Sequence, residues 1–206
     1  AAFGPWSGAP AAKLEGPAAA HGVLHISQET NQSQIGLAWD AVPDADPDSL
    51  LLQTALNVLS GGMGARLFTE IREKQGLCYS VQAGYASLKK QGAVFGYAGT
   101  SPERAQRTLD SFLVELERFT RGVTQEELER ALIGMKSRVI MQGESTGARA
   151  GALAYDFYHR GRTRTLDELR TLLEGVTLPR VNEFLAGHPV KGLTVVTLGP
   201  EALKVS

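Results

Sequence analysis

The chain has 206 residues, of which 43% are hydrophobic and 21% are charged, as in an ordinary globular protein with a full core. Its 21 basic and 22 acidic residues give a formal net charge of -1 without a cluster of basic residues, so neither nucleic acid nor an anionic membrane is expected as a partner. The only cysteine, Cys78, excludes an internal disulfide, and no run of about 18 to 20 apolar residues is present that could span a membrane.

Residues 1–20 are rich in Ala, Gly and Pro and have no periodicity, which predicts a linker or extended lead-in before a domain at 21–206. The N-terminus has no starting Met and no signal-peptide pattern, which favours a piece cut from a longer chain. The compartment stays open, with a soluble cytoplasmic protein preferred over a periplasmic one.

The first half of the domain is predicted to contain four strands, at residues 23–27, 34–39, 78–87 and 93–100. A helix is expected between the second and third strands, with Asp46 as its N-cap and Pro47 in its first turn. A shorter helix covers 65–74 and ends at Gly76. Cys78 lies in an apolar-leaning run, which predicts a small buried side chain in preference to a reactive thiol.

In the second half the apolar period changes to 3.6 residues, which predicts a series of helices. The first begins at Ser101-Pro102, and capping boxes start two others, Thr124 with Glu127 and Thr165 with Glu168. The helix after Thr124 is expected to turn five side chains inward: Leu128, Ala131, Leu132, Met135 and Val139. With a last strand at 193–198, this order predicts an α+β fold of two layers: a mostly antiparallel sheet of about five strands with helices packed on one face.

The stretch of residues 61–79 combines a glycine-rich turn, an amphipathic helix, a stop at Gly76 and the start of a strand. The reversal at Gly76 can bring Arg72 and Tyr79 to one surface, where a forked cation and a phenol suit binding a peptide carbonyl or stabilising an oxyanion. The structural alternative is that Arg72 complements the carbonyl end of its helix and Tyr79 is half in the core. The spacing alone favours this alternative.

The run GGMGARLFTEIREKQGLCYSV closely resembles the second-domain signature of the pitrilysin (insulinase) family of zinc metallopeptidases. That signature is a glycine-rich turn, a small residue, Arg-Leu-Phe, and an Arg-Glu-Lys-x-Gly-Leu-x-Tyr segment. About a dozen positions match in one block. The resemblance identifies the chain with the zinc-free, inactive C-terminal domain of that family.

The resemblance implies that a partner domain, on the same polypeptide or a separate subunit, carries zinc on a His-x-x-Glu-His motif. Arg72 and Tyr79 take the role of binding a peptide substrate beside that zinc. No cofactor is expected on this chain, which should be inactive alone, and we expect a dimer with the zinc-bearing domain. The alternative is a non-catalytic structural core subunit of the same fold, which has no need of both Arg72 and Tyr79.

Other candidate sites receive less support. The histidines, His21, His25, His159 and His188, do not form a His-x-x-Glu-His motif, and we expect no zinc site on this chain. Gly61–Gly64 lacks the Lys-Ser/Thr ending of a phosphate loop, and no Gly-x-Ser-x-Gly elbow is present. The stretch 160–164, with three arginines, is interpreted as a solvated loop.

Overall fold

A computed structural model describes residues 21–205 of the chain, and the predicted lead-in of residues 1–20 lies outside this range. The sheet has the strand order β1-β5-β2-β4-β3. Its strands are β1 (Val23–Ser27), β2 (Ser33–Ala41), β3 (Ser80–Ser87), β4 (Gly92–Thr100) and β5 (Thr194–Gly199). Only the β1–β5 pair is parallel. The predicted sheet of about five mostly antiparallel strands is confirmed.

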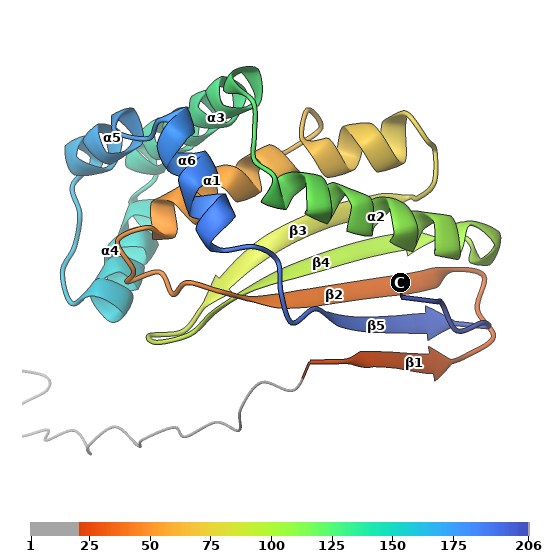
Figure 1. Ribbon diagram of the computed structural model, residues 1–206. Coiled ribbons are helices and arrows are strands. Elements are labelled where there is room, and N and C mark those ends of the chain that lie inside the picture. The colour runs from red at the N-terminus through yellow and green to blue at the C-terminus, as the bar shows by residue number, and fades with distance from the viewer. Residues whose placement is uncertain (1–20, 206) are drawn as a thin grey trace, which may run out of the picture.

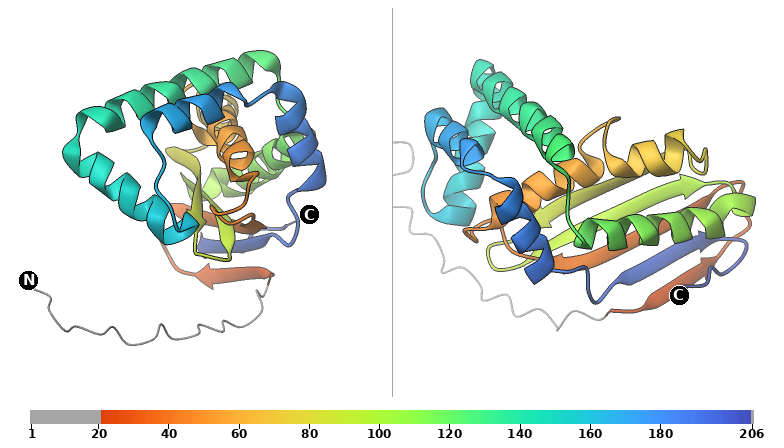
Figure 2. Two further views of the ribbon diagram at one scale, coloured as in Figure 1. Left: turned by 90° about the vertical axis from the view of Figure 1, so that its left-hand side faces the viewer. Right: turned by 45° about the horizontal axis from the view of Figure 1, so that its top comes forward.

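The described helices lie on one face of this sheet, and no other element within residues 21–205 covers the opposite face, called the uncovered face below (Figure 1). They are α1 (Ser49–Ser60), α2 (Ala105–Thr120), α3 (Gln125–Glu144), α4 (Thr146–Arg160), α5 (Leu166–Glu174) and α6 (Leu178–Gly187), with two short helical segments, η1 (Phe68–Glu73) and η2 (Pro102–Arg104). Helices α3, α4 and α5 gather toward the end of the sheet where a hairpin joins β3 to β4, as Figure 1 and the right view of Figure 2 show. None of the helices within residues 21–205 is long and apolar enough to cross a membrane.

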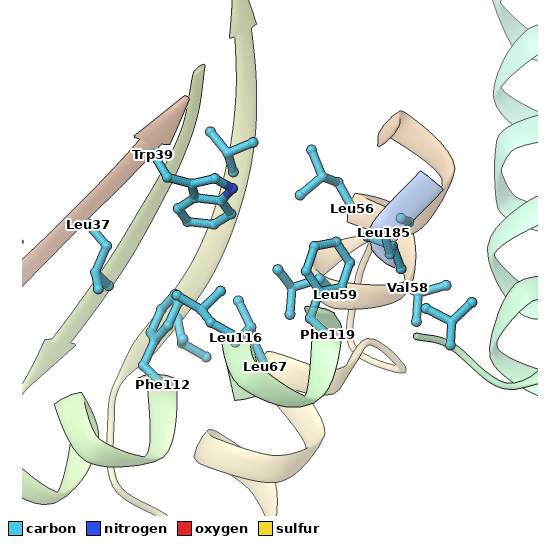
Figure 3. Packing of buried hydrophobic residues seen from close by; sticks show 14 of the residues in the cluster. Leu37, Trp39, Leu56, Val58, Leu59, Leu67, Phe112, Leu116, Phe119 and Leu185 are labelled. Carbon is cyan, nitrogen blue, oxygen red and sulfur yellow. The ribbon is translucent and has the colours of Figure 1, made fainter. Parts of the chain in front are cut away.

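The core lies between the covered sheet face and helices α1, α2 and α6 (Figure 3). The alternation of β2 places Ile35, Leu37 and Trp39 on this face, where they are almost completely buried. Helix α2 supplies a stripe of apolar residues at helical spacing: Leu109, Phe112, Leu116 and Phe119. Side chains that repeat every two residues along β2 thus pack against side chains that repeat every 3.6 residues along α2, which forms the two-layer core of an α+β fold.

Gly96 of β4 provides the space into which the ring of Phe112 packs. A Cβ at this position would lie 2.9 Å from Cζ and 3.3 Å from Cε1 of Phe112. Because the ring is fully buried, it has little room to move aside. We expect Gly96→Ala to reduce the free energy of unfolding by about 1 to 3 kcal/mol, measured by urea denaturation.

The matched control is Gly84→Ala in the neighbouring strand, where no atom lies within 4 Å of an added Cβ. It should leave the free energy of unfolding unchanged or slightly higher. Equal stability of the two variants would show that Phe112 does not need the space at Gly96.

Both predicted capping boxes are confirmed, since each threonine hydroxyl accepts the N–H of its glutamate and the glutamate carboxylate accepts the threonine N–H. The predicted start of the first helix is wrong. Helix α1 begins at Ser49 and not after Asp46, because the Asp46 carboxylate accepts the N–H of Asp48 and holds a separate turn before the helix.

Helix α3 is less buried than the sequence predicts. Of its five expected inward residues only Leu128 is fully buried. Met135 and Val139 are half-buried because they line a hollow of about 990 Å3 between α1, β3 and helices α3 to α5. The apolar stripe of α3 is therefore real, but its C-terminal half faces a cavity.

Candidate functional site

The helix that carries Arg72 departs from α-helical geometry. The sequence predicts a helix over 65–74, and the structure has a helix whose last six residues, Phe68–Glu73, form a π-helix. Here Lys74 N–H donates to the carbonyl of Thr69, five residues back, at 2.9 Å, while the earlier Thr69 N–H still donates to Ala65, four residues back. Single π-turns are rare and occur frequently at functional sites.

Arg72 lies in the last turn of this helix with an exposed side chain. Its guanidinium stands 4.9 Å from the centroid of the Phe68 ring, four residues earlier. Such a cation–π contact restricts the orientation of the guanidinium without using its five N–H donors. Phe68 is not among the predicted site residues, although its i, i+4 spacing to Arg72 is a usable signal.

The reversal after the helix is fixed by buried threonines. Gly76 adopts a left-handed conformation with φ of 61°, which favours glycine over every other residue. The next carbonyl, that of Leu77, accepts hydrogen bonds from the hydroxyls of Thr100 at 2.5 Å and Thr108 at 3.2 Å. Both threonines are completely buried, so the backbone between Arg72 and Tyr79 is held from the core side.

Tyr79 stands at the entrance to β3, with 57% of its surface exposed. The sequence predicts that this strand starts at Cys78, but it starts at Ser80. The N–H of Tyr79 donates to the carbonyl of Gly99 at 2.8 Å, and Ser80 also faces Gly99 in the strand register. Two residues opposite one are the arrangement of a β-bulge, which turns a side chain away from the regular pleat.

Cys78 is buried, as predicted. Burial raises the pKa of its thiol, and the nearby charge of Arg72 partly offsets this effect. The charge of Arg72 thus acts on the residue directly before Tyr79. The structure places Arg72 and Tyr79 on either side of one reversal, both exposed, without a hydrogen bond between their side chains.

The four histidines lie in separate places. His21 is 3.4 Å from the Asp40 carboxylate, and His25 bonds to Thr197. His159 packs against Tyr155 and Tyr158, and His188 stacks on Phe184. Within residues 21–205 no group of three or more His, Cys, Asp or Glu side chains could hold a metal ion. The described side chains therefore do not fit a zinc ion.

The prediction of a solvated loop at residues 160–164 is wrong for two of its arginines. Arg160 reaches Asp44 at 2.9 Å, and Arg164 reaches Asp156 at 2.5 Å. Their side chains are only 18% and 15% exposed, whereas Arg162 is exposed and pairs with Glu168. Arg160 thus joins the end of α4 to the turn before α1, and Arg164 holds the loop after α4 against that helix.

Similarity to known proteins identifies the family of the chain. The sequence profile described as "Peptidase M16 inactive domain" matches residues 3–135. An "uncharacterized zinc protease" of Bacillus subtilis, YmxG, is 32% identical over 162 residues, which are 77% of this chain and 39% of the relative. Another, SCO5738 of Streptomyces coelicolor, is 30% identical over 154 residues, or 74% of this chain and 33% of the relative. The chain thus spans less than half the length of these relatives.

A solved structure described as a peptidase M16 inactive domain from Pseudomonas fluorescens superimposes with a TM-score of 0.77 at 26% identity, covering 97% of this chain and 48% of that one. A protease from Helicobacter pylori shares the fold, with a TM-score of 0.77 at 19% identity, over 86% of this chain and 44% of that one. The profile covers well over half of the chain, and it carries the same description as the Pseudomonas structure. The chain belongs to the inactive-domain family of the M16, or pitrilysin-type, zinc peptidases.

Proposed function

We propose that this chain is the substrate-binding half of a zinc-dependent peptidase, in which Arg72 and Tyr79 hold the peptide backbone beside the zinc of a partner domain. One observation carries the proposal. The two residues flank a single reversal, and each stands at a local departure from regular backbone, Arg72 in a π-helix and Tyr79 at a bulge. Such departures are retained where they aim a side chain.

The chemistry of the two groups fits this role. The guanidinium of Arg72 offers several N–H donors, and the phenol of Tyr79 offers one O–H donor to a carbonyl oxygen. Both side chains are exposed, so a peptide can reach them. Polarisation of the scissile carbonyl and activation of water are the chemistry that zinc supplies on the partner domain, which we expect to carry the His-x-x-Glu-His motif.

The proposal is tested by assembly. Peptide hydrolysis and metal content are measured for the chain alone, for a zinc-bearing M16 domain alone, and for the two together. We expect no activity and no zinc from the chain alone, and hydrolysis only in the mixture. Because the two halves must meet for catalysis, activity should saturate as the chain is titrated into the zinc-bearing domain.

The alternative function is that of a structural core subunit. It predicts a stable complex with the partner, seen by size-exclusion chromatography, that hydrolyses no peptide. That result would replace the proposed function. Hydrolysis by the chain alone would contradict it in a different way, because it would require a catalytic centre within these residues.

A further inference from the structure

The uncovered face of the sheet carries a cluster of neutral polar side chains directly beside Tyr79. Gln34, Gly99 and Ser80 are register neighbours across β2, β4 and β3. Tyr97 lies two residues before Gly99 and therefore on the same face. We call Gln34, Ser80 and Tyr97 the polar cluster.

The side chains of the polar cluster converge above Gly99, which has no side chain of its own. The Tyr97 hydroxyl donates to Oε1 of Gln34 at 2.5 Å. A Cβ at Gly99 would lie 2.9 Å from the Tyr97 hydroxyl, 3.2 Å from Ser80 Oγ and 3.4 Å from Gln34 Oε1. Three polar groups from three strands therefore converge on one point, and the absence of a side chain at Gly99 gives them the room.

The polar cluster adjoins Tyr79, one of the two residues proposed to bind the substrate. Gly99, around which the cluster converges, accepts the backbone N–H of Tyr79 with its carbonyl. Tyr79 and the cluster are thus anchored to the same residue. The cluster lies on the face opposite the helices, at the end of the sheet away from the hairpin that joins β3 to β4 (Figure 1).

The chemistry of the surrounding face selects the class of ligand. Among the described residues that the register places on this face of the five strands, only Asp40 is charged. Gln34 Oε1 accepts the Tyr97 hydroxyl, and no hydrogen bond within residues 21–205 uses the two N–H donors of Gln34 Nε2, while the hydroxyl oxygens of Ser80 and Tyr97 can still accept. Neutral donors and acceptors side by side match the C=O and N–H groups of an extended peptide backbone.

We propose that Gln34, Ser80 and Tyr97 form a second backbone-binding subsite, which extends the grip on a peptide from Tyr79 onto the uncovered sheet face. This inference rests on the proposed function. It adds that binding depends on substrate length: a peptide confined to the residues around the scissile bond ends before the subsite, whereas a longer extended peptide reaches it. Because the cluster binds backbone groups, this dependence is on length and not on side-chain sequence.

The test uses the chain assembled with its zinc-bearing domain and two peptides that share one cleavage site, about five and about twelve residues long. We expect Tyr97→Phe and Gln34→Ala each to raise KM for the long peptide about 2- to 10-fold, the effect of one or two lost hydrogen bonds, with kcat unchanged. Neither variant should change KM for the short peptide. Gly99→Ala, whose added Cβ would displace the three side chains of the cluster, should also raise KM for the long peptide.

Gly36→Ala is the matched control. It lies on the same sheet face, but its added Cβ meets only the Val196 carbonyl at an ordinary 3.6 Å, so KM for both peptides should stay unchanged. Unchanged KM for the long peptide in Tyr97→Phe and Gln34→Ala, with slow turnover in Tyr79→Phe, would overturn the subsite and leave the proposed function standing. Full activity of Tyr79→Phe would instead overturn the proposed function.

Two more outcomes are decisive. If the cluster variants weaken assembly with the zinc-bearing domain, measured by sedimentation, and affect both peptides equally, the uncovered face is a domain interface and the subsite is wrong. If the unsubstituted assembly cleaves neither peptide, both proposals fall.

Discussion

Replacing Tyr79 by phenylalanine should slow peptide hydrolysis by the assembled protein about 10²- to 10³-fold, equivalent to about 3 to 4 kcal/mol of transition-state stabilisation. The substitution removes only a hydroxyl from a side chain that is 57% exposed, so neither the fold nor the zinc content should change. Because a donor to the developing oxyanion acts mainly in the transition state, we expect the loss in kcat more than in KM. Steady-state kinetics and elemental analysis of the same preparation measure both quantities.

The control for this prediction is Tyr158→Phe. Tyr158 has a similar exposure, 52%, but it lies on α4, which gathers at the opposite end of the sheet (Figure 2). Its loss of a hydroxyl should leave kcat and KM as they are. A normal rate for Tyr79→Phe, or an equal effect of both substitutions, would remove Tyr79 from the substrate site.

Arg72 should be equally sensitive to a change that keeps its charge. Arg72→Lys replaces a planar guanidinium, oriented by the ring of Phe68, with a single ammonium group. If Arg72 acts through its hydrogen-bonding geometry, the assembled protein should lose peptide hydrolysis even though the positive charge is retained. If Arg72 only complemented the carbonyl end of its helix, lysine would serve as well. The rate of peptide hydrolysis by Arg72→Lys, measured in the same assay as Tyr79→Phe, therefore separates the binding role of Arg72 from the structural one.

The parts of this fold that depend on neighbours in the sequence could be predicted. Both capping boxes need only a threonine and a glutamate three residues later, and both occur in the structure. The reversal at Gly76 needs only a glycine after an amphipathic helix, and it occurs as well. Local signals of this kind predict the order of strands and helices, and this order predicts the fold class.

The parts that depend on distant residues could not be predicted. The backbone after the π-helix is held at the Leu77 carbonyl by Thr100 and Thr108, which come 23 and 31 residues later. Arg160 is largely shielded from solvent because it pairs with Asp44 from the other half of the chain. In each case the decisive partner is brought close only by the complete fold. Arg72 and Tyr79 were found through family resemblance, whereas the polar cluster has no sequence signal, since its members come from three strands.

The pair of Arg66 and Glu127 connects the helix of Arg72 to α3 and should dominate the stability of the site. The Arg66 side chain is only 9% exposed, and it donates to the Glu127 carboxylate through Nε at 2.6 Å and through a terminal nitrogen at 2.7 Å. The same carboxylate accepts the N–H of Thr124 and so completes the cap of α3. Loss of this one charge leaves a buried guanidinium without its partner.

We therefore expect Glu127→Gln to reduce the free energy of unfolding at pH 7 by about 3 to 5 kcal/mol, measured by urea denaturation. Glutamine keeps the size of the side chain and can still serve in a capping box, so the loss reports on the charge. Glu126→Gln is the matched control. Glu126 pairs with Arg130 at an exposed position on the same helix turn, where a salt bridge contributes about 0 to 1 kcal/mol.

The same pair predicts the pH range in which this stability is lost. Burial alone would raise the pKa of Glu127, but hydrogen bonds from Arg66 and the Thr124 backbone, with the charge of Arg66, lower it from 4.5 to about 2. A group whose pKa is lower in the folded state stabilises the fold fully above the pKa of the unfolded state, about 4.5, and loses this effect as the pH falls toward 2. The difference in unfolding free energy between the natural protein and Glu127→Gln should therefore be constant from pH 7 to about 5 and narrow steadily below 4.5. A difference that stayed constant down to pH 3 would contradict a lowered pKa of Glu127 in the folded protein, and with it the stabilising role of its charge.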